Sequence, residues 1–513
     1  MQPPSPERDP APAPNVRARA ATGASTLVFV NLVSRGMGIF SIAVLARLLT
    51  PGDFGIVSLA MIVVEFAQML TDFQLIKALL RHPGRDQHLY ATAFTMAMLR
   101  GLLTAIGIAL AAIPAALLLH NQQVRDVLLV LAIVPIIDGL RSPRMVDYLR
   151  DIDFSQDAAV TIIGRVAGLL AMIAVALATH SYWALVTGTV VASIAMTIAT
   201  HWFKPFRPRL ALRDYGLFLG FGGWMSAAAI TNYASSKLDA LIVAGRFSVA
   251  RFGEYNLGMQ ISTIVTNQLA DPFERAIFSA LSSMTDDLPR RLRAYDSAQA
   301  TILGVLLPIG FGMALVAHEA IMVVAGPKWA DAIWVVRFVA PPMAIATVAV
   351  CAQALLMAEG DTRTVFIRNL IGLGARLVAL WVGVVQFGLT GLLAGYAISN
   401  IFYLFLTLQL AARRFSIPLL SPFLLAWRSF AATGAMIAAV LAFDATLALP
   451  SGTGFIDNLA MLVAKGAIGG LTYAAAHMLL WLASGRPPGF ERFMLDYIAH
   501  ARTSVLRRFT SPA

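Results

Sequence analysis

Charged residues are scarce in this sequence. Only 13% of the 513 residues are Asp, Glu, Lys or Arg, whereas 58% are hydrophobic. A soluble domain has about 25% charged and about 45–50% apolar residues, so a soluble core has no place for this excess. The mean hydropathy is +0.73. These values exclude an ordinary soluble protein and predict a membrane protein with many spans.

Motifs for redox, metal or nucleotide chemistry are also missing. Cys351 is the single cysteine, which excludes an internal disulfide or a cysteine-based metal site. The sequence has neither a Walker-type phosphate loop nor an HExxH motif. We therefore expect a protein that is not an enzyme and has no cofactor or metal. Four carboxylates between the fourth and fifth predicted spans are expected to form a solvated face: Asp147, Asp151, Asp153 and Asp157.

Apolar runs long enough to cross a membrane fill most of the chain. A helix needs about 20 apolar residues to cross about 30 Å of hydrocarbon. Two joints, near Ser181 and between Gln386 and Thr390, are short enough to require an immediate reversal. Cutting the sequence at polar, charged and Pro/Gly breaks predicts an all-α polytopic protein with about fourteen transmembrane helices, at 24–48, 53–76, 89–118, 124–146, 155–179, 181–203, 214–244, 250–273, 297–318, 331–357, 364–386, 389–412, 423–446 and 458–483.

Lysine and arginine are divided unevenly between the two sides of these spans. The two tails and the connections on their side hold 27 of the 39 Lys and Arg, and the other side holds 5. Because Lys and Arg are enriched in cytoplasmic loops, both termini are predicted to be cytoplasmic. This bias also accounts for the basic surplus, so no nucleic-acid partner is expected. Residues 1–22, rich in proline, predict a disordered tail.

Seven basic residues remain inside predicted spans. A charge at the bilayer centre costs about 2.5–3.5 kcal/mol and normally faces a bundle interior or a water-filled cavity. Arg35, Arg165 and Arg376 lie about ten or more residues from either span end, and with Arg100 they are predicted to face a cavity. The other three lie near outer ends, where long side chains snorkel and a structural role is expected: Lys237, Arg337 and Lys465.

Carboxylates are fewer than cations within the spans. Glu65, Asp239 and Glu254 are the three that lie well inside predicted spans. Internal ion pairs alone would leave arginines without a counter-charge, and an anionic ligand would complete the balance. Glu65 is the candidate for ion coupling, because a carboxyl group in a span can titrate. An ion pair between Glu65 and Arg35 is an equally supported alternative.

The chain contains a weak internal repeat. An offset of 198 residues places residues 46–60 on 244–258, at equivalent joints between spans, with Thr50 on Ser248. Two bundles related by a pseudo-two-fold axis, with a cavity between them, are therefore expected. GxxxG spacings at 391–395 and 466–470 predict close helix packing. The predicted domains are a cytoplasmic tail at 1–22, six-helix bundles at 23–203 and 204–412, an extra helix pair at 413–484 and a cytoplasmic tail at 485–513.

One stretch resembles a known family. Residues 45–60, LARLLTPGDFGIVSLA, followed by Asp72 and Phe73, are similar to the hallmark of the bacterial polysaccharide transporters, the oligosaccharide flippases. That family belongs to the superfamily of the multidrug and toxin extrusion antiporters and the peptidoglycan-precursor flippases. Later landmarks follow the family's order: FGEY at 252–255, LPIG at 307–310, GPKW at 326–329 and GLTG at 388–391.

The resemblance implies a flippase of the bacterial inner membrane. Such a protein moves an undecaprenyl-pyrophosphate-linked oligosaccharide repeat from the cytoplasmic to the periplasmic leaflet by alternating access, for surface polysaccharide such as lipopolysaccharide or exopolysaccharide. Its implied partners are the lipid-linked glycan, membrane lipids, a coupling proton or sodium ion, and a polysaccharide polymerase with its chain-length regulator. No site residue carries over from the family. On their position and charge alone, Arg35, Arg100, Arg165 and Arg376 would hold the pyrophosphate by charge-assisted hydrogen bonds, and Glu65 would bind the coupling ion.

Two alternatives stay open at this stage. A cation-coupled multidrug exporter of the related antiporter family would need acidic residues in its cavity to attract organic cations. The predicted spans instead contain more basic than acidic residues. A non-transporting subunit of a polysaccharide synthesis complex is compatible with every feature above. Transport by the purified protein in liposomes separates the two classes, because a scaffold alone moves nothing.

Overall fold

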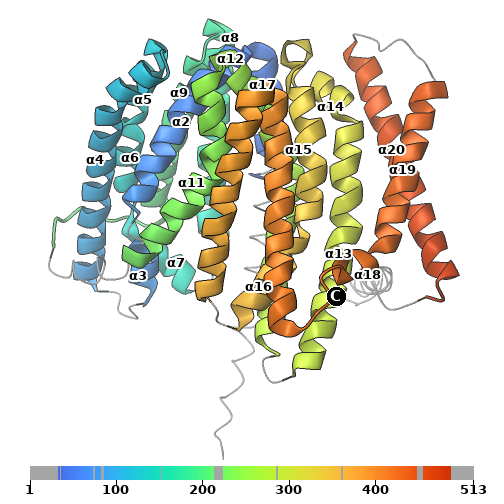
Figure 1. Cartoon of the computed structure of the whole chain (residues 1–513). Helices are drawn as coiled ribbons and strands as arrows, with labels where there is room; N and C mark the ends of the chain where they lie inside the picture. The colour runs from blue at the N-terminus through green and yellow to red at the C-terminus, as the bar shows by residue number, and fades with distance from the viewer. Residues whose placement is uncertain are drawn as a thin grey trace, which may run out of the picture. The chain divides into compact units, whose positions relative to one another are not determined.

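The computed structural model describes residues 30, 33–34, 36–72, 75–81, 86–151, 153–212, 223–284, 287–359, 362–446 and 454–486. These residues form helices joined by short turns, with no strand among them (Figure 1). The predicted all-α fold class is confirmed. The N-terminal tail, residues 487–513 and Arg35 lie outside the described residues.

The chain divides into two compact units, Met1–Ala234 and Ser235–Ala513. The division falls within α11 (Gly223–Arg246). The first unit contains the helix Gly36–Leu48, α2 (Pro51–Leu70), α3 (Leu75–Arg81), α4 (Gln87–Leu118), α5 (Gln122–Leu131), α6 (Ile133–Gly139), η1 (Pro143–Met145), α7 (Val146–Arg150), α8 (Ser155–Thr179) and α9 (Trp183–Phe203). The second contains α12 (Val249–Ser282), α13 (Leu288–Leu315), α14 (Ala317–Val324), η2 (Pro327–Trp329), α15 (Ala332–Ala346), α16 (Val348–Ala358), α17 (Thr362–Phe415), α18 (Ser421–Leu425), α19 (Trp427–Thr446) and α20 (Phe455–Ala483).

Within the described residues, each predicted span overlaps with helix, and residues 24–29 of the first span and 214–222 of the seventh lie outside them. Within the described ranges, nine helices are long and apolar enough to cross a membrane. The fourth predicted span is divided between α5 and α6, the tenth between α15 and α16, and the eleventh and twelfth both lie in α17. Apolar side chains also remain on the outside, such as Leu110 (73% exposed), Leu118 (77%) and Ile456 (77%). Exposed apolar surface on long helices is what a bilayer covers, so the chain is a multi-pass membrane protein.

The LTPGD part of the family-like stretch builds a helix start. Thr50 is the N-cap of α2, Pro51 follows at the first helical position, and the side chains of Thr50 and Asp53 form a reciprocal capping box. The second oxygen of Asp53, Oδ1, accepts the backbone N–H of Tyr182 at 3.1 Å, which fixes the tight joint before α9. Ser248, the residue that the repeat places on Thr50, is the N-cap of α12.

The predicted reversal between Gln386 and Thr390 is confirmed. Gly388 has φ 61° and ψ −137°, a conformation open mainly to glycine, so α17 consists of a first arm (residues 362–387) and a second arm (389–415). The arms touch closely, since a Cβ on Gly391 would lie 2.0 Å from the carbonyl oxygen of Gly383. A Cβ on Gly395 would lie 2.4 Å from the carbonyl oxygen of Ala379, which confirms the packing predicted at 391–395.

The second GxxxG prediction is wrong. An added Cβ on Gly466 or Gly470 would meet nothing within 4 Å, so neither glycine lies at a close helix contact. The glycine that faces α19 is Gly469, where an added Cβ would lie 3.4 Å from the Met436 side chain. A four-residue spacing gives the two glycines a common face of a helix but does not say which face meets a neighbour.

Candidate functional site

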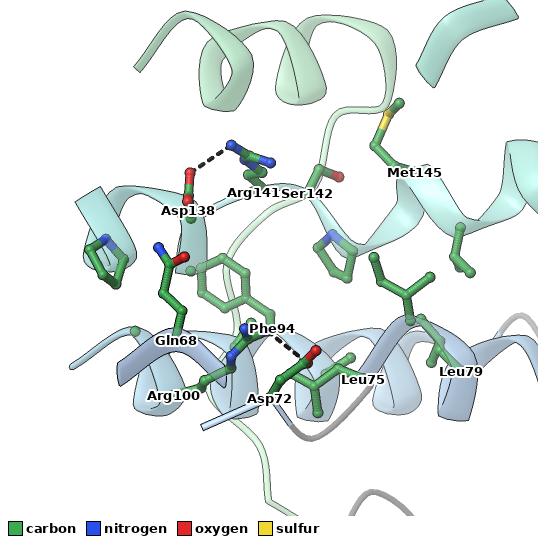
Figure 2. Close-up of a pocket in the computed structure, with 18 of the residues that line it drawn as sticks. Gln68, Asp72, Leu75, Leu79, Phe94, Arg100, Asp138, Arg141, Ser142 and Met145 are labelled. Atoms are coloured by element: carbon green, nitrogen blue, oxygen red, sulfur yellow. Dashed lines mark hydrogen bonds and ion pairs between the residues drawn. The ribbon is translucent and has the colours of Figure 1, made fainter. Parts of the chain in front are cut away.

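A cavity of about 620 Å³ lies within the first unit (Figure 2). It is bounded by α2, α3, α4 and α6, by the turn that leads into α7, and by the start of α8. Most of the wall is apolar, with Leu75, Leu79 and Phe94 on one part and Met145 and Leu149 on another. Its polar lining consists of Gln68, Asp72, Arg100, Thr104, Asp138, Arg141, Ser142 and Asp157.

Two arginine–aspartate pairs line this cavity. Arg100 Nη1 lies 3.4 Å from Asp72 Oδ1, and Arg141 Nη2 lies 2.6 Å from Asp138 Oδ1. Figure 2 shows the two pairs with the Phe94 ring between them. All four side chains are 31–37% exposed, so they reach the open space of the cavity. Ser193 Oγ also donates to Asp138 Oδ1 at 2.5 Å, which holds that carboxylate from α9.

Glycines beside these charged residues bring the two walls together. Gly101 follows Arg100, and a Cβ there would lie 2.3 Å from the carbonyl oxygen of Pro135. Gly139 follows Asp138, and a Cβ there would lie 2.7 Å from the carbonyl oxygen of Ala97. α4 and α6 therefore meet backbone to backbone, and the residue before each contact glycine faces the cavity.

Asp147 and Arg150, which directly follow Val146 and Leu149 of the cavity lining, belong to a buried polar cluster with Tyr90. Tyr90 donates to Asp147, and Arg150 donates to the Tyr90 hydroxyl at 3.0 Å and to the carbonyl oxygen of Leu79 at 2.6 Å. Asp147 is only 3% exposed. The expectation of a solvated carboxylate face is therefore wrong for Asp147, whose partners are Tyr90 and Arg150 rather than water. Asp157, in contrast, lines the open cavity.

The residues predicted from sequence to form the site are distributed over both units. Arg100 lines the cavity. Arg165 is exposed on α8, and its Nη1 lies 3.3 Å from the carbonyl oxygen of Ser34. Glu65 is half-buried on α2, with its Oε2 3.5 Å from the Tyr233 hydroxyl, so the structure places it beside α11. Arg35 lies outside the described residues, and the proposed pair with Glu65 stays a prediction.

Arg376 belongs to a separate cluster in the second unit. Its Nη2 lies 3.0 Å from Asp239 Oδ1, and its guanidinium carbon lies 4.8 Å from the centre of the Tyr396 ring. Tyr255 donates to the same Asp239 carboxylate. The pair joins α11 to α17, and the side chain of Asp239 is 4% exposed. Arg376 therefore has a carboxylate partner within its own unit.

Sequence reasoning missed several charged residues that the structure brings together. Arg141 and Asp138 lie near the end of the fourth predicted span and were not proposed as site residues. A charged residue followed by glycine, at 100–101 and again at 138–139, was the sequence signal for a charged side chain next to a close helix contact. Lys465 was expected to snorkel, but its Nζ lies 2.7 Å from Glu319 and 2.8 Å from Asp444. Both carboxylates lie near helix ends, where the count of carboxylates within spans did not include them.

The cavity can bind an amphiphile with a polar head. Guanidinium groups bind phosphate oxygens through paired, charge-assisted hydrogen bonds. Leu75, Leu79 and Phe94 offer apolar surface next to Arg100. Within the described residues, no group of three or more His, Cys, Asp or Glu side chains is arranged to hold a metal ion.

Comparisons with known proteins agree with this architecture. The profile of a family described as polysaccharide biosynthesis protein matches residues 44–334. The lipopolysaccharide biosynthesis protein WzxC of Escherichia coli (strain K12) is 22% identical over 398 residues, which are 75% of this chain and 80% of that protein. The succinoglycan biosynthesis transport protein ExoT of Rhizobium meliloti (strain 1021) is 23% identical over 325 residues, 62% of this chain and 65% of that protein.

Solved structures show the same fold. The lipid II flippase MurJ in an inward closed conformation aligns with a TM-score of 0.71 at 11% identity, over 90% of this chain and 99% of that chain. An inward-facing multidrug resistance transporter of the MATE family, in the MOP superfamily, aligns with a TM-score of 0.62 at 12% identity, over 77% of this chain and 98% of that chain. The family match covers more than half of the sequence, and the chain therefore belongs to the polysaccharide biosynthesis protein family.

Proposed function

We propose that this protein is a flippase that moves undecaprenyl-pyrophosphate-linked oligosaccharide repeats across the bacterial inner membrane, by alternating access, for surface polysaccharide synthesis. The observation that carries the proposal is the cavity of the first unit, which offers two guanidinium groups beside an apolar wall inside a membrane bundle. Family membership and the flippase fold support it. The positive-inside bias supports cytoplasmic termini.

Arg100 and Arg141 are the headgroup ligands in this proposal. Each already has an aspartate, so the anion would share or displace that carboxylate at the open face of the pair. A hydrogen bond to a charged group contributes about 1.5–3 kcal/mol, or about 10–150-fold in affinity. Arg35, Arg165 and Arg376 stay predictions as further ligands, and Glu65 as the residue that binds the coupling proton or sodium ion.

The test is polymer rescue in a bacterium that lacks its own flippase for a defined surface polysaccharide. Both the polymer and the accumulated lipid-linked repeat are measured. We expect the wild-type chain to restore polymer and clear the repeat, and Arg100→Gln or Arg141→Gln to lower polymer at least tenfold at equal membrane expression. Arg125→Gln is the matched control, since Arg125 pairs with the adjacent Asp126 on α5 and does not line the cavity.

Asp72→Asn separates ligand binding from a purely structural ion pair. It removes the carboxylate and leaves the Arg100 cation in place, so a headgroup-binding Arg100 stays active in this variant. Equal losses in Asp72→Asn and Arg100→Gln would contradict the headgroup role. No rescue with any of a panel of repeat structures, at normal expression, would contradict the flippase proposal itself.

A multidrug exporter is the second candidate, and one observation favours it. The cavity lining holds three carboxylates, Asp72, Asp138 and Asp157, against two arginines, so its formal charge is negative. Organic cations would be attracted to such a lining. Raised resistance to cationic drugs in an expressing strain, lost in Asp157→Asn, would establish this function instead, whereas unchanged resistance with polymer rescue supports the flippase.

A further inference from the structure

The second unit contains two arginine–tyrosine stacks between the arms of α17. The guanidinium carbon of Arg368 lies 4.8 Å from the centre of the Tyr403 ring, and that of Arg376 lies 4.8 Å from the Tyr396 ring. Because the arms are antiparallel, the two stacks repeat about two helical turns apart. Gly372 leaves room for the first stack, since a Cβ there would lie 2.6 Å from the Tyr403 ring.

The two stacked arginines differ in their counter-charge. Arg376 forms an ion pair with Asp239 at 3.0 Å. Arg368 Nη2 donates instead to two neutral amide oxygens, Gln353 Oε1 and Asn369 Oδ1, each at 2.8 Å. The Glu274 carboxylate accepts from Gln353 Nε2 at 3.0 Å, so Gln353 lies between Glu274 and Arg368 in a chain of hydrogen bonds. Among the described residues, no carboxylate forms an ion pair with Arg368.

The remaining donors of Arg368 have no acceptor. The residue is 1% exposed, and neither Nε nor Nη1 has a hydrogen-bond partner among the described residues. Nε is also unpartnered in Arg376 and Arg291, but those arginines have a carboxylate at Nη2. Among the buried arginines that the structure describes, Arg368 alone lacks a partner at Nη1 as well. Burying a cation with unsatisfied donors is costly, so a group that supplies the missing anion would bind there with a large gain.

We propose that Arg368 is an anion-binding residue of the second unit that takes a phosphate oxygen of the transported lipid headgroup. This rests on the proposed function, and it adds a ligand that lies near the cytoplasmic end of a predicted span. A cavity of about 310 Å³ in the same unit is lined by Glu274, Arg275, Phe278, Ala354 and Met357. Glu274 of this cavity accepts a hydrogen bond from Gln353, and Gln353 accepts one from Arg368, so in this proposal the anion reaches Arg368 by displacing that chain.

Asn369→Asp is the sharpest test, because it builds an internal counter-ion. Asn369 Oδ1 accepts from both Arg368 Nη2 and the Tyr403 hydroxyl, at 2.8 and 3.0 Å, so a carboxylate oxygen keeps both hydrogen bonds. The full-length protein in phosphatidylcholine nanodiscs is titrated with farnesyl pyrophosphate, and binding is followed by thermophoresis. We expect Asn369→Asp to keep or raise the melting temperature and to lower the affinity at least tenfold.

Arg368→Gln and Arg337→Gln complete the series. Arg368→Gln is expected to lower the affinity as much as Asn369→Asp does, and Asn369→Asp decides if Arg368→Gln fails to fold. Arg337 is the matched control, an exposed membrane arginine stacked on Trp334 at 5.7 Å, and Arg337→Gln is expected to bind as the wild type does. Inorganic pyrophosphate is titrated in parallel, to separate a lipid headgroup from free phosphate.

The outcomes separate this inference from the proposed function. Unchanged affinity in Asn369→Asp and Arg368→Gln, with polymer rescue by the wild type, would overturn the Arg368 site and leave the flippase standing. Binding of inorganic pyrophosphate alone, weakened in Asn369→Asp, would support the anion site and overturn the lipid as its source. Absence of both polymer rescue and farnesyl pyrophosphate binding in the wild type would overturn both proposals.

Discussion

Lys465→Met removes the single cation from a buried cluster that joins three helices. Lys465 on α20 lies 2.7 Å from Glu319 Oε1 on α14 and 2.8 Å from Asp444 Oδ1 on α19. The side chains of Lys465 and Glu319 are 7% and 8% exposed, whereas that of Asp444 is 37% exposed. The cluster therefore couples the last two helices to the rest of the second unit by a mostly buried ion pair.

The size of the effect follows from this burial. Glu319 Oε2 already has no partner, so loss of Lys465 leaves the whole carboxylate buried and unpaired. Breaking a buried pair on one side costs about 3–5 kcal/mol, and an exposed pair such as that with Asp444 contributes about 0–1 kcal/mol. At about 2–4 °C per kcal/mol for a unit of this size, a loss of about 3–5 kcal/mol should lower the melting temperature by about 6–20 °C.

The single cysteine provides the assay. Cys351 is 0% exposed in the second unit, so a maleimide dye that fluoresces on reaction with a thiol reports unfolding of that unit during a thermal ramp. The double variant Lys465→Met with Glu319→Gln should recover most of the loss, because the stranded charge is gone. Lys328→Met, at an exposed lysine of η2, is the control and should melt like the wild type. A shift below about 2 °C in Lys465→Met, or no recovery in the double variant, would refute the reasoning.

Two glycine substitutions test the backbone geometry. Gly388→Ala places a side chain at φ 61° and should lower the stability of the second unit by about 1–3 kcal/mol in the same thiol assay. Gly374→Ala, with nothing within 4 Å of its added Cβ, is the control and should melt like the wild type. Equal melting temperatures for the two variants would count against a strained reversal. Gly139→Ala places a Cβ 2.7 Å from the carbonyl oxygen of Ala97 and should push α4 away from α6, so polymer rescue should fall several-fold. Gly107→Ala, on α4 with nothing within 4 Å of its added Cβ, is the control and should retain full rescue.

The sequence predicted the helices of this protein well because their signals are local. In lipid, an apolar run of about 20 residues must satisfy its backbone N–H and C=O groups internally, so it forms a helix whatever its neighbours are. The reversal at Gly388 and the cap formed by Thr50 and Asp53 depend on a few adjacent residues, and these were visible as well. The resemblance to polysaccharide transporters was also visible in one short stretch, residues 45–60, and the family match over residues 44–334 confirms it.

The partners of the charges inside the membrane were decided only by tertiary structure. Arg376 and Asp239 are 137 residues apart in sequence, and Lys465 and Glu319 are 146 apart. Arg368 falls at the cytoplasmic end of the predicted span 364–386, where no sequence signal indicated a partner, yet it is buried against Gln353, Asn369 and Tyr403.

The physical reason is that hydropathy fixes where a helix begins and ends but not which of its faces meets a neighbour. That choice depends on the fit of small residues at close contacts. At Gly101 and Gly139 two helix backbones touch, and this contact orients Arg100 and Asp138 toward the same cavity. The sequence alone therefore determined a polytopic helical membrane protein of this family. The packing of its helices determined which arginines have a carboxylate partner and which, like Arg368, have only neutral acceptors.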